Sequence, residues 1–246
     1  KEGVLTRTFT AVMPSGRMAE VTARRFLSMD EPEVAAINYT VRITGGNGTA
    51  ELIPWLNADV YNEDANYDEK FWEKESSARD GKRTAVVAQT RKTAFVVATA
   101  MENTFTLNGK PAKGQPVITT TDKTAHCALK SDYADGDTFT VIKYVAVLSS
   151  FNHPVEGLAE KAMDSAGKAA TKGFDSLLEA HRNAWEKKWE HGDIVIRGDI
   201  AAQQGIRFNI FQLNQTYTGE DPRLNIGPKG FTGEKYGGST YWDTEA

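Results

Sequence analysis

Residues 1–150 consist of short runs with β-strand character, and no helical segment separates them. In the clearest run, Ile37–Ile43, apolar side chains fall on every second position, the pattern of a strand with one buried face. Other runs rich in Val, Thr, Ala and aromatic residues predict further strands at Thr84–Thr90, Ala94–Ala100, Val117–Thr121 and Thr138–Ser149. Turn signals separate these runs at Gly45–Gly48, Asp80-Gly81, Asn108-Gly109 and Asp135–Asp137. Many strands without intervening helices predict an antiparallel β-sandwich over residues 1–152.

The hydrophobic period becomes helical after His153-Pro154. Val155–Thr171 is rich in Ala, Glu and Lys and predicts one helix, and Asp175–Glu190 predicts a second. Apolar and aromatic residues recur along the second helix at steps of three and four: Phe174, Leu177, Leu178, His181, Trp185 and Trp189. We interpret this face, its His and both Trp included, as a packing surface. The two helices form a predicted linker over residues 153–192.

A third helix is predicted from Asp199, a favourable N-cap, to about Tyr217. One side of it is apolar: Ile206, Ile210, Phe211, Leu213 and Tyr217. We interpret Arg207 and the pair Gln203-Gln204 as groups on the helix surface or between helices. The predicted order is therefore a sheet domain, a helical linker, and the start of a helical unit over residues 193–246.

Composition argues against several classes of partner. The chain has 29 Lys+Arg against 33 Asp+Glu, a net charge of −4, and no basic stripe that would indicate nucleic-acid binding. Its apolar runs, such as Tyr144–Leu148, are too short to cross a membrane. A single Cys excludes an internal disulfide, and no Cys/His spacing fits a metal site. We interpret Cys127 and its neighbour His126 as packing residues and expect neither a metal nor a cofactor.

Six of the 20 residues from Gly219 to Gly238 are glycine. The spacing fits neither a phosphate-binding P-loop nor a dinucleotide-binding fingerprint, because Gly238 is followed by Ser rather than Lys and no strand–helix–strand context surrounds it. Tyr241-Trp242-Asp243 follows and places aromatic rings beside a carboxylate. Sugars need both, a flat ring for their C–H face and a carboxylate for their hydroxyls. The residues alone leave open a sugar site and a glycine-rich loop whose aromatic residues only pack.

Gly230–Gly238 followed by Trp242-Asp243-Thr244-Glu245 resembles the signature of glycoside hydrolase family 65, with the maltose phosphorylase branch as the best match. Stretches along the rest of the chain agree with it: Lys1–Phe9, Val34–Leu52 and Gly198–Leu213. The resemblance implies an N-terminal antiparallel β-sandwich (a supersandwich), linker helices, and the beginning of an (α/α)6 barrel. It also implies a fragment, with a sandwich that begins earlier and a barrel that continues after Ala246.

The resemblance further implies an inverting phosphorylase that converts maltose and phosphate to β-glucose 1-phosphate and glucose, with phosphate as co-substrate. The family's enzymes are usually homodimers, and we expect a cytoplasmic parent, although a chain beginning at Lys1 would hide a signal peptide. The family's general acid and phosphate loops lie in barrel segments beyond this chain. We therefore assign no catalytic residue here and expect the chain to be inactive alone.

Trp242 and Asp243 match family positions that line the glucose pocket on the non-reducing side of the scissile bond. We expect Asp243 to bind glucose hydroxyls, Trp242 to bound the ring and Tyr241 to form a neighbouring wall. We do not assign the general acid to Glu234 or Glu245, because a carboxylate in the sequence is not by itself evidence for that role.

Two other functions compete with this prediction. One is a trehalose, kojibiose or nigerose phosphorylase, or a hydrolase of the same fold, because the acceptor-side residues lie downstream. The other is a non-catalytic carbohydrate-binding or scaffold sandwich, because residues 1–150 contain no clustered acid/base set. The helix and motif within residues 199–245 argue against the second, since a binding module would not need them.

Overall fold

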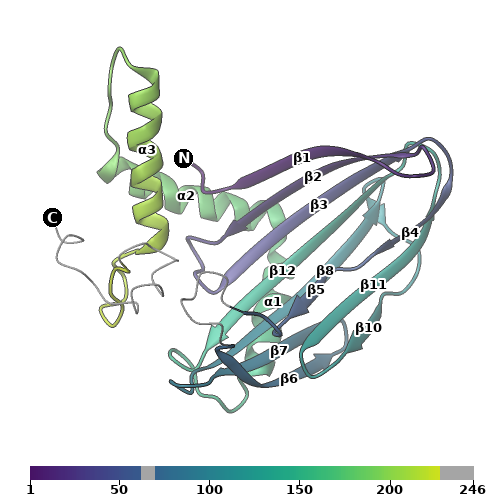
Figure 1. Cartoon of the computed structure of the whole chain (residues 1–246), viewed down its shortest axis with the longest axis horizontal. Coiled ribbons are helices and arrows are strands. Elements are labelled where there is room, and N and C mark those ends of the chain that lie inside the picture. Colours follow the sequence, from purple (N-terminus) through teal and green to yellow (C-terminus); the bar gives the residue numbers. More distant parts are fainter. Residues whose placement is uncertain (62–69, 228–246) are drawn as a thin grey trace. The chain divides into compact units, whose positions relative to one another are not determined.

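The computed structural model describes residues 1–61 and 70–227 (Figure 1). Contacts divide the chain into two compact units. The sandwich unit comprises Val4–Val60 and Phe71–His181, and the helical unit comprises Lys1–Gly3, Tyr61–Lys70 and Arg182–Ala246. Each unit is described by itself.

Two antiparallel sheets form the sandwich unit. The large sheet has the order β1-β2-β3-β12-β8-β7-β6, with β9 paired to β8: β1 (Leu5–Val12), β2 (Met18–Leu27), β3 (Val34–Thr44), β6 (Trp72–Asp80), β7 (Arg83–Thr90), β8 (Val96–Leu107), β9 (Lys110–Pro111) and β12 (Thr138–Ser149). The small sheet has the order β10-β11-β4, with β5 paired to β11: β4 (Gly48–Leu52), β5 (Trp55–Asn57), β10 (Val117–Thr120) and β11 (Thr124–Tyr133). The predicted antiparallel sandwich is confirmed.

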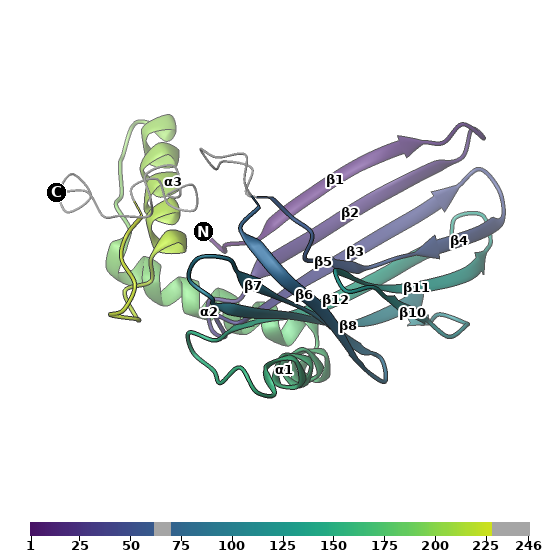
Figure 2. The same cartoon turned by 60° about the horizontal axis from the view of Figure 1, so that its bottom comes forward.

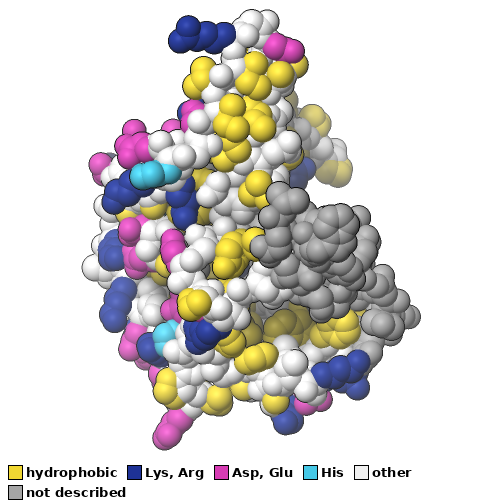
Figure 3. All heavy atoms as spheres, turned by 90° about the vertical axis from the view of Figure 1, so that its left-hand side faces the viewer, with side chains coloured by type: hydrophobic (Ala, Val, Ile, Leu, Met, Phe, Trp, Pro, Cys, Tyr) yellow, Lys and Arg dark blue, Asp and Glu magenta, His cyan; other side chains and the backbone are white. Residues whose placement is uncertain are grey.

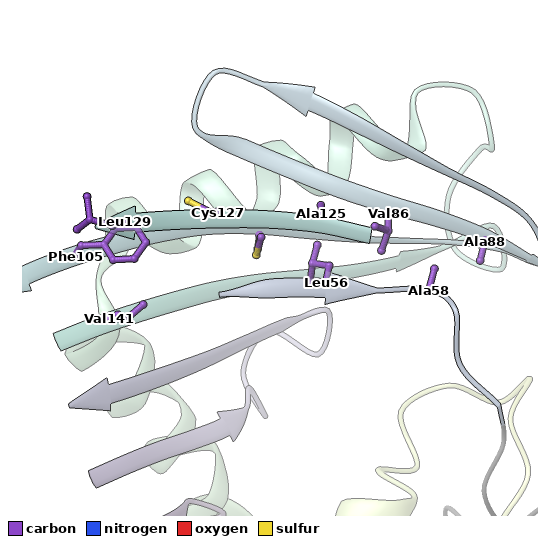
Figure 4. Packing of buried hydrophobic residues seen from close by; sticks show 10 residues of the cluster. Leu56, Ala58, Val86, Ala88, Phe105, Ala125, Cys127, Leu129 and Val141 are labelled. Atoms are coloured by element: carbon purple, nitrogen blue, oxygen red, sulfur yellow. The ribbon is translucent and has the colours of Figure 1, made fainter. Parts of the chain in front are cut away.

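The space between the sheets holds the main hydrophobic core. Side chains of β5, of the residue just after it and of β11 meet those of β7, β8 and β12: Leu56, Ala58, Val86, Ala88, Met101, Phe105, Ala125, Cys127, Leu129 and Val141. Figure 4 labels all of them except Met101. Cys127 is 3% exposed, which confirms it as a packing residue. His126 points the other way, because alternate residues of a strand face opposite sides. It is half-buried and its ring stacks on Trp55, so His126 is also a packing residue, but on the outer face of the small sheet rather than in the core.

The opposite face of the large sheet is covered by helix α1 (Leu158–Lys172) and the first turns of α2 (Phe174–Gly192) (Figure 2). Alanines line this part of the sheet and the helix: Ala85, Ala98, Ala100 and Ala146 meet Ala162 and Ala166. Small side chains on both surfaces allow a close approach of helix and sheet. Burial on both faces explains why β7 and β8 lack a strict polar–apolar alternation.

The predicted turns have two different roles. Asn108 and Gly109 both have positive φ, 50° and 75°, in the two-residue loop between β8 and β9, as a tight hairpin turn requires. The turns at Gly45–Gly48 and Asp135–Asp137 instead carry the chain between the sheets. They lie together, since the Gly45 amide donates to Asp135 Oδ1 at 2.8 Å and the Asp135 amide donates to Asn47 Oδ1 at 2.9 Å.

All three predicted helices are present. The interpretation of the second helix's face as packing is confirmed, because each member is less than 9% exposed: Phe174, Leu177, Leu178, His181, Trp185 and Trp189. His181 Nδ1 accepts a bond from the Met29 amide at 3.1 Å, and its ring packs on Phe26. Within residues 1–61 and 70–227, no helix combines the length and hydrophobicity needed to cross a bilayer. The domain boundaries at 152 and 192 stay predictions.

Candidate functional site

The predicted sugar-binding residues Tyr241, Trp242 and Asp243 lie outside the described residues, as do Glu234 and Glu245. What the structure describes is the part of the helical unit that leads to them. It comprises the second half of α2, the connector 193–199, helix α3 (Ile200–Thr216) and residues 217–227.

The start of α3 is held by its cap and by one glutamine. Asp199 Oδ1 accepts the Ala202 amide at 2.9 Å, so the predicted N-cap is confirmed. Gln203 Nε2 donates to the Ile194 carbonyl at 2.8 Å, and Gln203 Oε1 accepts the Ile196 amide at 2.7 Å. A single amide thus bonds the connector backbone on both sides of Val195. Gln203 is therefore an inter-segment group, whereas its neighbour Gln204 is exposed.

One turn after Gln203, Arg207 joins α3 to the end of α2. Its Nε and Nη2 each donate to Asp193 at 2.8 Å, and they reach different carboxylate oxygens. Lys1 Nζ lies 2.6 Å from Asp193 Oδ2, so the carboxylate binds two cations. The hydrogen bonds from Arg207 and Lys1 hold the pKa of Asp193 well below its ordinary value, and the same pairing raises the pKa of Arg207. Fork-to-fork pairing fixes direction as well as distance, so this contact orients α3.

This pairing predicts a specific pH dependence. A depressed Asp pKa stabilises the folded state above about pH 4, the ordinary Asp value, and that contribution is lost as pH falls toward the folded pKa. Arg207→Met should bring the folded pKa of Asp193 closer to the ordinary value. The variant's free energy of unfolding should then fall less steeply between about pH 5 and pH 2.5. Urea unfolding at a series of pH values measures this slope.

The control is Arg42→Met, which removes an exposed pair with Glu20 at 3.5 Å in the sandwich unit. It should leave the slope of the parent chain unchanged. Parallel curves for Arg207→Met and the parent would contradict a stabilising role for the Asp193 pair.

One turn after Arg207 on α3, at Phe211, α2 and α3 also meet through stacked aromatic rings. The Trp185 ring lies 5.0 Å from that of Phe211 and 6.2 Å from that of Trp189, both at 29°. Trp189 Nε1 donates to the Lys1 carbonyl at 2.7 Å. Gly3 passes so close that a Cβ there would overlap the Trp185 indole, and its φ of 62° is one that glycine adopts without strain. Residues 1–3 are thus part of the packing around the α2–α3 pair.

The remaining surface of α3 carries apolar side chains that the described residues leave exposed. The helix has no buried residue, and Ile200, Phe208 and Leu213 are 88%, 59% and 67% exposed. Hydrophobic side chains are visible on the surface of the helical unit at the top of Figure 3. A helix with one face packed and others apolar is typical of an element inside a larger helical assembly.

In this region, the polar contacts of the described residues join the connector 193–199 to α3. No group of three or more His, Cys, Asp or Glu side chains within residues 1–61 and 70–227 could hold a metal ion. Asp193, a strongly perturbed carboxylate, is engaged by Arg207 and Lys1. Sequence reasoning singled out Arg207 and Gln203 but missed Asp193 and Lys1, because pairs 14 and 192 residues apart leave no local pattern.

Comparison with known proteins assigns the two ends of the chain to consecutive domains. The model for the N-terminal domain of glycosyl hydrolase family 65 matches residues 1–188, and the model for that family's central catalytic domain matches residues 207–246. The chain belongs to glycosyl hydrolase family 65. The family 65 catalytic match begins at Arg207 itself and includes Tyr241, Trp242 and Asp243.

Family 65 relatives match along the entire chain. It is 37% identical to a maltose phosphorylase of Bacillus subtilis and 26% identical to an α,α-trehalose phosphorylase of Thermoanaerobacter brockii. Each match covers 100% of this chain and 32% of the relative, so the chain spans about a third of the length of these proteins. Among solved structures, a putative kojibiose phosphorylase from the human microbiome superposes with a TM-score of 0.86 at 22% identity, covering 99% of this chain and 31% of that one. This likeness supports the fold.

Proposed function

We propose that the complete protein is an inverting phosphorylase of an α-glucosidic disaccharide, which converts maltose and phosphate to β-glucose 1-phosphate and glucose. The observation that carries the proposal is the consecutive match of the family 65 N-terminal and catalytic domains along this chain. Maltose is favoured because identity to the maltose phosphorylase, 37%, exceeds identity to the trehalose phosphorylase, 26%.

In this proposal the chain contributes part of the glucose pocket. Asp243 accepts hydrogen bonds from glucose hydroxyls, Trp242 bounds the sugar ring and Tyr241 forms the adjoining wall. Helix α3, which precedes these residues in the chain, is anchored through Arg207 and Gln203. The barrel that covers the exposed apolar side of α3 supplies the remaining groups.

The chemical step requires groups that we place outside this chain. An inverting hydrolase needs one carboxylic acid for the leaving oxygen and a second carboxylate to activate water. Phosphate is already an anionic nucleophile, so it needs positioning more than deprotonation. We assign the proton donor and the phosphate-binding groups to the rest of the barrel, and we expect this chain alone to be inactive, with phosphate as co-substrate and no cofactor.

The test is phosphorolysis by the complete protein. Incubated with maltose, it should release glucose 1-phosphate only when phosphate is present, and proton NMR should identify the β-anomer. Release of glucose without phosphate would instead identify a hydrolase. Phosphate-dependent turnover of trehalose, kojibiose or nigerose but not maltose would support a phosphorylase and change the glycosidic linkage assigned to its substrate.

A non-catalytic sandwich module is the alternative from another class. Calorimetry of this chain with maltose separates the two, because half of a pocket should not bind the disaccharide tightly, whereas a dedicated module should. The match of residues 207–246 to a catalytic domain argues for the enzyme.

We also propose a homodimeric complete protein acting in the cytoplasm. A sugar phosphate is charged and does not cross a bilayer unaided. The cell therefore keeps the sugar phosphate that phosphorolysis makes only if the enzyme acts in the cell interior. Sedimentation of the complete protein tests the dimer.

A further inference from the structure

The outer face of the small sheet carries a stacked pair of rings. Leu56 of β5 points into the core and is 6% exposed, so its neighbours Trp55 and Asn57 lie on the opposite face. Trp55 is 50% exposed and lies opposite His126 of β11. The two ring centroids are 5.6 Å apart at 15°. We propose that this surface is a carbohydrate-binding platform, made by other residues than the predicted glucose pocket.

The groups around the rings are uncharged hydrogen-bonding side chains. Thr119 of β10 lies opposite His126, and Asn57 lies opposite Thr124. Thr124 Oγ1 is 2.9 Å from Thr121 Oγ1. Hydroxyl and amide groups beside a flat ring match the two surfaces of a sugar, its hydroxyl edge and its C–H face.

The charges next to this surface do not indicate an ionic ligand. Lys123 and Asp59 flank it in the chain and pair with each other at 3.2 Å. A phosphate, a nucleic acid or an acidic peptide would each need Lys or Arg side chains that are not already paired with a carboxylate. Farther along the same face of β11, exposed Lys130 lies opposite Glu51, so a carboxylate accompanies this cation too. Because the described residues place no cluster of cations beside the rings, the surface favours a neutral polyhydroxylated ligand. Val117, opposite Ala128, extends the apolar part of the face, and a protein partner is an outcome of the test below.

The backbone under the rings is fixed from two sides. The Cys127 amide donates to the Pro54 carbonyl at 3.0 Å, which ties β5 to β11. Lys143 Nζ of the large sheet donates to the Trp55 carbonyl at 2.5 Å. Burial lowers the pKa of Lys143 to about 8, so the amine remains mostly protonated at neutral pH and keeps its donors. A platform on rigid strands loses little entropy on binding, which suits a weak surface site.

The experiment is native affinity electrophoresis of the whole chain in gels containing glycogen, an α-glucan, or hydroxyethylcellulose, a β-glucan. The platform does not depend on the proposed function, and only the choice of glycogen as first probe rests on it. The wild-type chain should be retarded by glycogen. Trp55→Ala should bind about tenfold more weakly, as the loss of one aromatic contact predicts, and Trp55→Tyr should retain most of the retardation.

The matched control is Phe95→Ala, which removes a 40% exposed ring that contacts Phe151 elsewhere in the sandwich unit. It should leave the retardation unchanged, and circular dichroism should show that all three variants are folded. Retardation by hydroxyethylcellulose alone, lost in Trp55→Ala, would support the platform and change the linkage of its ligand.

No retardation in either gel, or equal retardation of wild type and Trp55→Ala, would overturn the proposal. So would a Trp55-dependent self-association in sedimentation without retardation, because the face would then be a protein interface. A complete protein that failed to release glucose 1-phosphate would leave this result untouched, so the two failures are distinguishable.

Discussion

Replacing Asp243 by Ala in the complete protein is expected to lower kcat/KM for phosphorolysis by a factor on the order of 10³. A carboxylate that accepts two sugar hydroxyls makes charge-assisted hydrogen bonds, which are stronger than neutral ones. Those bonds hold the glucose ring while its anomeric carbon gains positive charge, so they strengthen toward the transition state. The loss should therefore appear in kcat as well as in KM. Steady-state rates of glucose 1-phosphate release measure both.

The control for Asp243→Ala is Asp221→Ala, which makes the same change of charge in the same segment of the chain. Asp221 pairs with Arg223, two residues away, and that pairing lowers the pKa of Asp221 to about 2. Because Asp221 is engaged by Arg223 close by in the chain, we expect its removal not to affect sugar binding. If Asp243→Ala kept the wild-type kcat/KM, the assignment of residues 241–243 to the glucose pocket would be wrong. A rise in KM with unchanged kcat would mean that Asp243 binds the sugar equally in the ground state and the transition state.

The order of elements could be predicted from the sequence because each has its own local period. Ile37–Ile43 alternates and lies within β3, and the face from Phe174 to Trp189 recurs at helical spacing and is buried. The layering could not be predicted. The alanines at 85, 98, 100 and 146 carry little hydrophobic signal of their own, yet together they form the surface on which α1 packs. Which turns join neighbouring strands and which cross between sheets is likewise set by distant pairing, as between Gly45 and Asp135.

For the candidate site, the motif at 241–243 was found because adjacent residue types suggested a chemistry, and family resemblance gave that chemistry a role. The contacts that hold α3, the helix before this motif, could not be found from the sequence in the same way. Asp193 is one carboxylate among many in the sequence, and its importance arises only where Arg207 and Lys1 meet it. Trp55 is a similar case, since it appears in the sequence as one residue of a short strand. Its exposure follows from the burial of Leu56 beside it.

Trp185→Ala is expected to give the largest loss of stability, about 3–5 kcal/mol in the free energy of unfolding of the helical unit. Trp185 is 2% exposed and stacks on Phe211, so its ring joins α2 to the helix that leads to the predicted sugar site. Its removal leaves a cavity that the neighbouring Trp189, held by its bond to the Lys1 carbonyl, cannot fill without breaking that bond. Urea unfolding measures the loss, provided that the two units are followed by separate signals.

Trp55→Ala is the matched control for Trp185→Ala, because it deletes the same side chain from a 50% exposed position in the sandwich unit. Its cost should stay below about 1 kcal/mol, since most surface substitutions change stability little. In the complete protein, Trp185→Ala should also lower kcat at temperatures where the protein remains folded, because α3 would no longer be held in one position before residues 241–243. Equal stability of the two variants would mean that the stacked rings do not hold α3. The Asp193–Arg207 pair and the Gln203 amide would then have to orient α3 without them.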